Sequence, residues 1–170
     1  MTTGAGAEAT RGQLDELYQR TAPAGLRVAY LLTGDAGLAE DLVQEAFARL
    51  IGRLRHLREP AAFDAYLRRT IVNLSASHFR HQAVVRAYER RYAGVEHATN
   101  EPDVVEHEAM RRALLGLPQR QRAAIVLRFY EDLPEAEVAE ILKCRPGTVR
   151  SLVTRGVQAM RPSFERVGDE

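Results

Sequence analysis

The residues with the clearest chemical role lie in the segment from Pro134 to Met160. Hydroxyl and guanidinium side chains here fall outside the apolar positions of a helix, and such groups donate hydrogen bonds to phosphates and base edges. A further arginine precedes this helix and would lie near a nucleic-acid backbone. We therefore expect a DNA contact formed by Arg145, Thr148, Arg150, Ser151, Thr154 and Arg155.

The apolar residues of the same segment have the spacing of a helix-turn-helix, a motif that places its second helix in the major groove. Residues 143–145 form the turn, and Pro146 suits the first position of the second helix, where its missing N–H costs nothing. Taken alone, the segment also fits an ordinary helical hairpin with a solvated arginine face. The two apolar stripes are Val138, Ile141 and Leu142, then Val149, Val153, Val157 and Met160.

A second polar stripe lies in the first half of the chain. It combines an aromatic ring, two arginines and an amide at intervals of three or four, so its members share one helix face. Such a surface suits nucleic acid, although a solvated helix face fits equally well. The stripe consists of Tyr66, Arg69, Asn73, Ser77 and Arg80.

Charge is distributed in blocks. Residues 68–91 and 143–166 are each rich in arginine, whereas residues 93–110 carry only acidic charges. Two basic blocks separated by an acidic one indicate two contacts with a polyanion. A GC-rich genome would produce the same preference for arginine over lysine, so the arginine content alone does not decide the matter.

The composition limits the classes of protein. The 170 residues, 45% of them hydrophobic, can form one medium or two small domains. There is no bilayer-length apolar run and no leader-like segment, so we expect a cytoplasmic protein without membrane contact. Cys144 is the single cysteine, which excludes internal disulfides. We expect no metal, no cofactor and no catalytic residues, because the required clusters are missing from the sequence.

Helical periodicity throughout predicts an all-α protein with two small helical domains, at 12–92 and 103–165. Residues 93–102 are expected to form a flexible linker, and the second domain to be a four-helix helix-turn-helix domain. Residues 1–11 are expected to be disordered. We expect Pro23 to kink or break its helix, and Gly34 and Asp35 to end one helix and cap the next.

The apolar stripes also predict which side chains form the core. On the helix after Asp35, polar residues share the outer face. The predicted inward residues are Leu42, Val43, Ala46, Leu50 and Ile51; Phe63, Leu67, Ile71 and Leu74; and Ile125, Val126, Phe129 and Tyr130.

Three stretches resemble one family. DAGLAEDLVQEAFARLI, from Asp35, resembles the second conserved region of extracytoplasmic-function (group 4, SigE-like) sigma factors of the sigma-70 family. FDAYLRRTIVNL, from Phe63, resembles the promoter-binding helix of that region, and residues 117–161 resemble the fourth conserved region. These sigma factors are two-domain specificity subunits of bacterial RNA polymerase. The resemblance covers most of residues 14–162, in the family's order.

The resemblance implies that the first domain binds the polymerase clamp coiled coil and the promoter −10 element. The implied polymerase contacts are Asp41, Gln44, Glu45 and Phe47, of which Phe47 also fits a core position. The implied −10 contacts are Leu54, His56, Leu57 and Arg58 in a loop that captures an extruded base, and Phe63, Tyr66, Arg69, Asn73 and Arg80 on the following helix.

The second domain would bind the −35 duplex, with its recognition helix in the major groove, and the polymerase flap. The resemblance therefore implies core RNA polymerase and promoter DNA as partners. It also implies control by an anti-sigma factor that contacts both domains. Free of these partners, the protein is expected to be a monomer.

The sequence departs from the family at three positions of the helix-turn-helix. Pro134 stands where a serine commonly caps the first helix, so we expect Asp132 to cap instead; a lost cap costs about 1 kcal/mol. Arg145 replaces a frequent serine before Pro146. Leu152 occupies a position that is often arginine, where it would contact a thymine methyl group or pack at the rim.

Two alternatives remain at the level of the sequence. A conventional helix-turn-helix regulator with a sensing or dimerising first domain explains residues 134–160 equally well, but not the AEDLVQEAF helix and the stripe that follows it. A helical interaction protein would tolerate neutralisation of Arg150 and Arg155.

Overall fold

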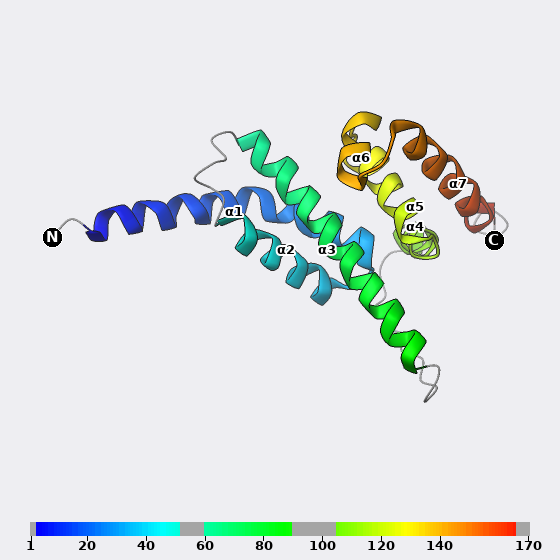
Figure 1. The fold of residues 1–170 in the computed structure, drawn as a ribbon, viewed down its shortest axis with the longest axis horizontal. Helices are drawn as coiled ribbons and strands as arrows, with labels where there is room; N and C mark the ends of the chain where they lie inside the picture. Colours follow the sequence, from blue (N-terminus) through cyan, green and yellow to red (C-terminus); the bar gives the residue numbers. More distant parts are fainter. Residues whose placement is uncertain (1–2, 52–59, 90–104, 166–170) are drawn as a thin grey trace.

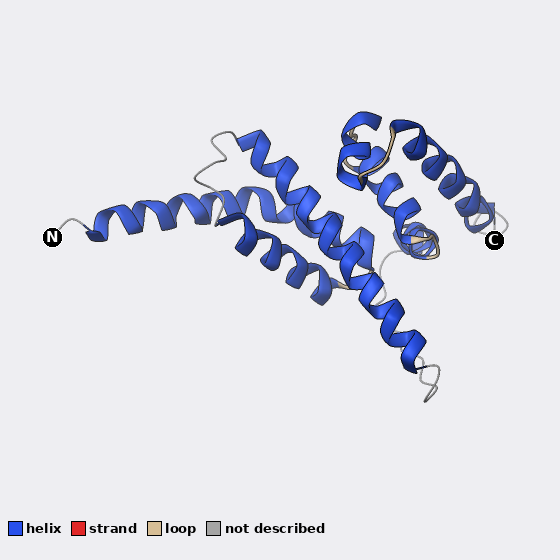
Figure 2. Ribbon diagram, in the orientation of Figure 1, coloured by secondary structure: helices blue, strands red, loops and turns tan. Residues whose placement is uncertain are grey.

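The computed structural model describes residues 3–51, 60–89 and 105–165, and within these ranges the chain is helical with short connections (Figures 1 and 2). The predicted all-α class is confirmed, since the described ranges contain no strand. The first group of helices is α1 (Thr3–Thr33), α2 (Ala36–Ile51) and α3 (Pro60–Glu89). The second is α4 (Val105–Leu115), α5 (Gln119–Ile125), the π-helical turn η2 (Val126–Tyr130), α6 (Glu135–Leu142) and α7 (Pro146–Glu165).

The junction between α1 and α2 forms as the sequence predicts. Gly34 has a φ of +72°, in the left-handed region, and its N–H donates to the Tyr30 carbonyl at 2.7 Å. The Asp35 carboxylate accepts a hydrogen bond from the backbone N–H of Leu38 at 2.9 Å. Glycine tolerates this backbone without a Cβ penalty, and the aspartate satisfies an N–H that the helix leaves free.

Two expectations for α1 are wrong. The helix begins at Thr3, so residues 3–11 are helical rather than disordered, and it continues past Pro23 to Thr33 (Figure 1). The proline ring lies on the exposed side, while Ala22 and Val28 are buried on either side of it. Tertiary packing of α1 against α2 and α3 therefore holds the helix together where local propensity favours a break.

The core of the first domain follows the predicted stripes of α2 and α3. The buried set is Leu42, Val43, Ala46, Leu50, Phe63, Leu67, Ile71 and Leu74. Ile51 was predicted inward but is exposed, because it is the last residue of α2 and lies beyond the packed face. Three aromatic rings pack in sequence, with centroids 4.8 Å apart for Tyr18 and Phe47 and 5.4 Å apart for Phe47 and Phe63.

The second domain contains a π turn that changes the orientation of the residues after α5. The N–H of Glu131 donates to the Val126 carbonyl at 3.0 Å, an i to i+5 bond. The wider turn rotates the residues at its end relative to a regular helix. Phe129 and Tyr130, predicted inward, are instead 65% and 51% exposed. Leu133 is buried, and the Arg128 guanidinium donates to its carbonyl, tying the turn to the following loop.

The buried face of α7 also differs from the prediction. Val149 and Met160 are buried as expected, but Leu152 and Gly156 complete the face, and Val157 is 39% exposed. The reason is a close approach of α7 to α5: a Cβ placed on Gly156 would lie 2.5 Å from the Ile125 Cδ1 atom. A glycine at this position therefore sets which side of α7 faces the core.

The turn between α6 and α7 agrees with the sequence, whereas the cap of α6 does not. Lys143 adopts a left-handed conformation with a φ of 51°, and α7 begins at Pro146. Pro134 occupies the N-cap of α6 without a side-chain hydrogen bond. Asp132, expected to cap this helix, has a φ of 50° and forms part of the bend that follows η2. The N-terminal end of α6 therefore lacks the predicted cap.

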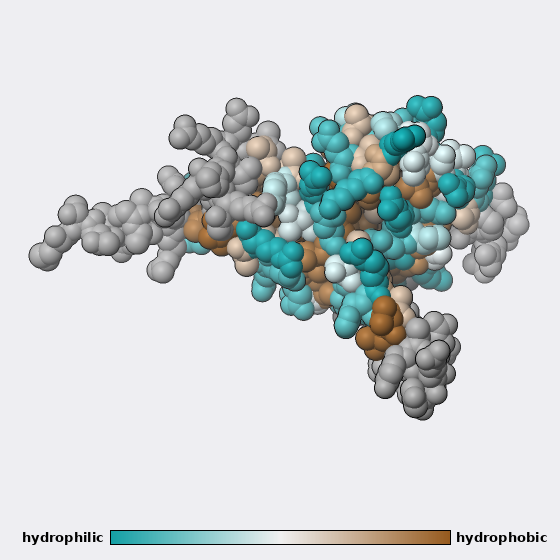
Figure 3. All heavy atoms as spheres, in the orientation of Figure 1, coloured by the Kyte–Doolittle hydropathy of each residue, from teal (hydrophilic) through white to brown (hydrophobic). Residues whose placement is uncertain are grey.

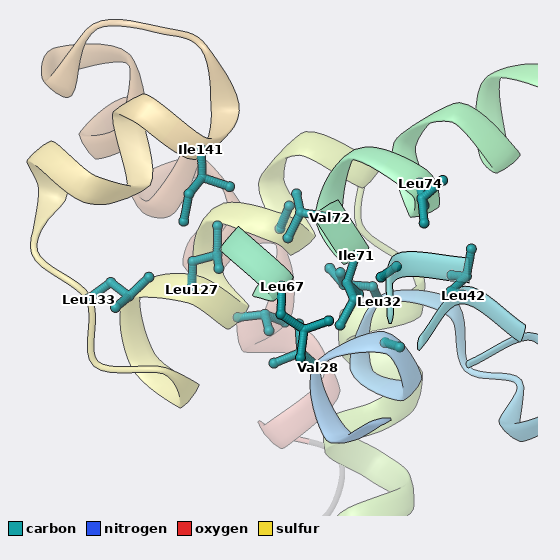
Figure 4. Close-up of a cluster of buried hydrophobic side chains, with 14 of the residues drawn as sticks. Val28, Leu32, Leu42, Leu67, Ile71, Val72, Leu74, Leu127, Leu133 and Ile141 are labelled. Atoms are coloured by element: carbon teal, nitrogen blue, oxygen red, sulfur yellow. The ribbon is translucent and has the colours of Figure 1, made fainter. Parts of the chain in front are cut away.

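The two groups of helices pack against each other. Their buried apolar side chains form one cluster, in which Leu127, Leu133 and Ile141 lie on the side of α3 that carries Leu67 and Val72 (Figure 4). The linker predicted at 93–102 lies outside the described residues. The structure therefore shows a closed arrangement of the two domains.

Gly34 contributes to this arrangement, because a Cβ at this position would lie 2.5 Å from the Leu115 Cδ1 atom on α4. We expect Gly34→Ala to lower the free energy of unfolding by about 1–2 kcal/mol from the left-handed backbone alone. Displacement of Leu115 adds to this loss. Thermal and denaturant unfolding measure it.

Gly12→Ala is the matched control, since nothing lies within 4 Å of a Cβ at Gly12 in α1. That change should leave stability unchanged or raise it by up to about 1 kcal/mol through helix propensity. Equal stability of the two variants would contradict the role given to Gly34.

Candidate nucleic-acid interface

The outer face of α7 and the turn before it carry all the predicted −35 contacts. Each of these side chains is exposed: Arg145, Thr148, Arg150, Ser151, Thr154 and Arg155. The Ser151 hydroxyl donates to the Gly147 carbonyl at 3.0 Å, and the Arg155 Nε donates to the Ser151 carbonyl at 3.3 Å. The face thus presents cationic and hydroxyl groups together. Hydrophilic side chains predominate over α3 and the second domain in Figure 3.

Arg150 is held by a carboxylate of the neighbouring helix. Its Nε and Nη2 atoms donate to Oε1 and Oε2 of Glu135 at 3.1 and 3.0 Å. The hydrogen bond from Arg150 lowers the pKa of the Glu135 carboxyl, so this group stays ionised to a lower pH than an unpaired glutamate. The pair persists above the ordinary carboxyl range and is lost only as the pH falls through the lowered pKa. Nothing in the residue spacing of the sequence points to Glu135 as part of this face.

Leu152 packs inside the domain rather than toward DNA. Its side chain is 9% exposed and lies on the buried face of α7. Of the two roles expected for Leu152, the structure therefore supports packing. Leu152 therefore adds nothing to the exposed polar face of α7.

The predicted −10 surface is divided among three environments. Asn73, Arg69 and Arg80 are exposed on α3, and Tyr66 is half-buried against the core. Phe63 lies in the core, so its ring can contact DNA only if the first domain opens locally. The loop residues Leu54, His56, Leu57 and Arg58 lie outside the described residues. The structure thus assembles the polar part of the stripe on one helix face.

Part of α3 is engaged by the second domain. Arg68 Nε forms an ion pair with Glu131 Oε2 at 2.7 Å, and Arg69 Nη2 donates to the Glu140 carbonyl at 3.3 Å. An open pocket adjoins this ion pair, with Arg20, Asp64 and Leu67 among its lining residues. Arg69, one of the predicted DNA contacts, is therefore partly used for contact between the domains.

Arg122 links the two domains from within their interface. Its side chain is only 7% exposed, and its Nη1 donates to the Leu32 carbonyl of α1 at 2.5 Å. Its Nη2 donates to the carbonyls of Leu115 and Leu117 at 2.8 and 3.1 Å. The guanidinium carbon also lies 5.3 Å from the centre of the Phe79 ring. Burial lowers the pKa of Arg122, yet an arginine stays charged in proteins.

The four residues predicted to contact polymerase lie in two environments on α2. Asp41, Gln44 and Glu45 are exposed, and Glu45 accepts a hydrogen bond from Arg49 at 2.5 Å. Phe47 is buried between the Tyr18 and Phe63 rings. Its core interpretation therefore holds in this structure, and the side chain offers no surface to a partner.

Residues 3–51, 60–89 and 105–165 contain no group of three or more metal-ligating side chains. No helix within them combines the length and apolarity needed to cross a membrane.

Comparison with protein families matches both halves of the chain. Sigma-70 region 2 matches residues 17–94, and sigma-70 region 4 matches residues 107–160. The matches occur in this order and together span most of the chain.

Comparison with individual proteins agrees. The chain is 33% identical to the ECF RNA polymerase sigma factor SigE of Mycolicibacterium smegmatis, over 97% of this chain and 66% of that protein, just under two thirds of its length. It is 30% identical to the RNA polymerase sigma-E factor of Streptomyces antibioticus, over 90% of this chain and 85% of that protein. A similar solved fold is RpoE of Bartonella quintana in complex with the anti-sigma factor NepR, with a TM-score of 0.74, 21% identity and coverage of 90% and 97%.

The contacts of Arg122 predict that Arg122→Leu opens the closed arrangement. Hydrogen bonds to charged groups are worth about 1.5–3 kcal/mol each, and this change removes the bond to α1 together with the two that orient it. We expect a larger radius of gyration in small-angle X-ray scattering, with helix content by circular dichroism unchanged.

Arg120→Leu is the control, because Arg120 carries the same charge but donates to the Leu142 carbonyl within its own domain. An unchanged radius of gyration in Arg122→Leu would mean that the apolar contacts alone keep the domains together.

Proposed function

Because the chain belongs to the sigma-70 family of RNA polymerase sigma factors, in its extracytoplasmic-function group, we propose that it binds core RNA polymerase and directs it to promoters through −10 and −35 elements. The observation that carries this proposal is the presence, in one chain, of an exposed acidic and amide face on α2 and an exposed cationic face on a helix-turn-helix. The first suits a protein partner, and the second suits the major groove.

The roles of individual residues follow from these two faces. Asp41, Gln44 and Glu45 contact the clamp of the largest polymerase subunit, and the α7 face reads the −35 duplex. Asn73, Arg80 and, after release from the second domain, Arg69 contact the −10 DNA. We assign residues 12–92 to polymerase and −10 binding, residues 103–165 to −35 binding, and residues 93–102 to the linker between the two domains.

The closed arrangement must open before both promoter elements are bound. Elements centred at −10 and −35 are about 25 base pairs apart, which is roughly 85 Å along B-DNA at 3.4 Å per base pair. In the structure, α3 and α6 are close enough for Arg69 to donate to the Glu140 carbonyl. Since the two DNA-binding faces cannot span such a distance while the domains touch, promoter binding requires their separation.

Further aspects of the proposal concern partners and location. An anti-sigma factor that binds the closed arrangement more tightly than the open one would hold the two DNA-binding faces together and away from a promoter. The related RpoE structure, solved with an anti-sigma factor, is consistent with a partner of this kind. The protein acts in the cytoplasm, needs no cofactor and has no catalytic activity of its own. Its contribution is to place the polymerase and to use binding energy to help open the DNA.

A conventional helix-turn-helix regulator is the less favoured alternative. It accounts for α6 and α7 but not for the region 2 match over residues 17–94. A regulator would also bind promoter DNA without core polymerase.

The deciding experiment is run-off transcription with purified core polymerase and genomic DNA fragments. We expect specific transcripts that depend on the chain, and their start sites identify the promoters. The variant Asp41→Asn/Glu45→Gln should lower core affinity, measured by co-purification, because it removes two exposed carboxylates from one face. Glu16→Gln, an exposed site on α1, is the control. Core polymerase that ignores the wild-type chain would refute the proposal.

A second prediction concerns the α7 face. Arg155→Ala should weaken binding to the −35 duplex and reduce the slope of log affinity against log salt by about 1, because one phosphate contact is lost. Anisotropy titrations at several salt concentrations measure both effects. An unchanged slope would show that Arg155 does not neutralise a phosphate.

A further inference from the structure

We propose that Glu135 is a positioning residue for −35 recognition, holding the guanidinium of Arg150 in the orientation from which it reads a guanine. The proposal rests on the proposed function of α7 as the recognition helix. It goes further by naming a residue outside that helix and the base that the pair would select.

The geometry of the pair fixes both ends of the contact. Both carboxylate oxygens of Glu135 are used, one for Nε and one for Nη2 of Arg150, so the guanidinium is held in a fork rather than by a single bond. Glu135 is the first residue of α6, and α6 packs on α7 through the fully buried Val138 and Val149. The spacing between carboxylate and guanidinium is therefore set by the core of the helix-turn-helix.

The exposure of the two side chains shows which one is free to meet a ligand. The Arg150 side chain is 74% exposed, whereas that of Glu135 is 30% exposed. The carboxylate is thus seated against the domain, and the guanidinium extends beyond it. Arg155 differs, because its Nε donates to the carbonyl of Ser151 on its own helix.

The donors that remain on Arg150 suit guanine. A guanidinium has five N–H donors, and the pair with Glu135 occupies one on Nε and one on Nη2. The remaining Nη1 and Nη2 hydrogens form the edge that binds O6 and N7 of guanine in the bidentate contact. Because the side chain is oriented before DNA arrives, less of its conformational freedom is lost on binding.

The charge of Glu135 makes the proposal testable. A carboxylate beside a DNA-binding face repels phosphates, so it lowers affinity for every sequence alike. The two possible roles of Glu135, repelling DNA or orienting Arg150, therefore predict different results when its charge is removed. In the first case all duplexes bind more tightly by the same factor. In the second, discrimination between duplexes falls.

The experiment measures binding of the full chain to DNA duplexes by fluorescence anisotropy. The reference duplex carries the −35 element found by run-off transcription. Each substituted duplex carries the same element with one guanine replaced by 7-deazaguanine, which lacks the N7 acceptor. We expect Glu135→Gln to bind the substituted duplex as tightly as the wild-type chain does, or more tightly. We also expect about a tenfold loss of discrimination at one guanine, within the range of a bidentate contact. Arg150→Ala should abolish discrimination at that same guanine.

Glu137→Gln is the matched control, because it removes the same charge from an exposed position in the first turn of α6. It should strengthen binding to both duplexes without changing their ratio. If Glu135→Gln behaves like this control, or if Arg150→Ala and Glu135→Gln affect different guanines, the proposal is wrong. A wild-type chain that discriminates no duplex would instead refute the recognition role of α7 itself.

Discussion

The buried guanidinium of Arg122 is the contact on which the arrangement of the two domains depends. It lies near the C-terminal ends of both α1 and α4, where backbone carbonyls have no partner within their own helix. One cation satisfies carbonyls from both domains and interacts favourably with the negative ends of two helix dipoles. Burying a charge is costly, and the carbonyl hydrogen bonds offset part of that cost, although the buried Nε atom has no hydrogen-bond partner within the described residues.

The rest of the interface follows from that junction. Gly34 ends α1 and leaves room for Leu115, and the Arg68–Glu131 pair lies on the α3 side of the contact. Relative motion of domains is the default unless their interface is large and hydrophobic, and promoter binding as proposed requires the interface to open. The same helices thus pack together in the closed arrangement and, once the domains separate, present two separate DNA-binding faces.

Within the second domain, two backbone features set the recognition face. The π turn at Val126–Tyr130 directs Phe129 and Tyr130 to solvent, and Gly156 allows α7 to approach Ile125. The close approach at Gly156 is the reason that Leu152 rather than Val157 packs inward. The polar residues of α7 then occupy one uninterrupted side, and Glu135 at the start of α6 is close enough to hold Arg150.

Much of the molecule is determined by the sequence itself. Helical periodicity, the Gly34–Asp35 junction, the turn at residues 143–145 and the exposed polar face of α7 are local, because each depends on residues within a turn or two of one another. The tertiary structure decided the rest. Periodicity locates a buried face only where the helical hydrogen bonds are regular. The π turn breaks that regularity, so the prediction that Phe129 and Tyr130 face inward is wrong. The hydrogen-bond partners of Arg122 and Arg150 lie on other helices, and spacing along the chain carries no signal for such contacts.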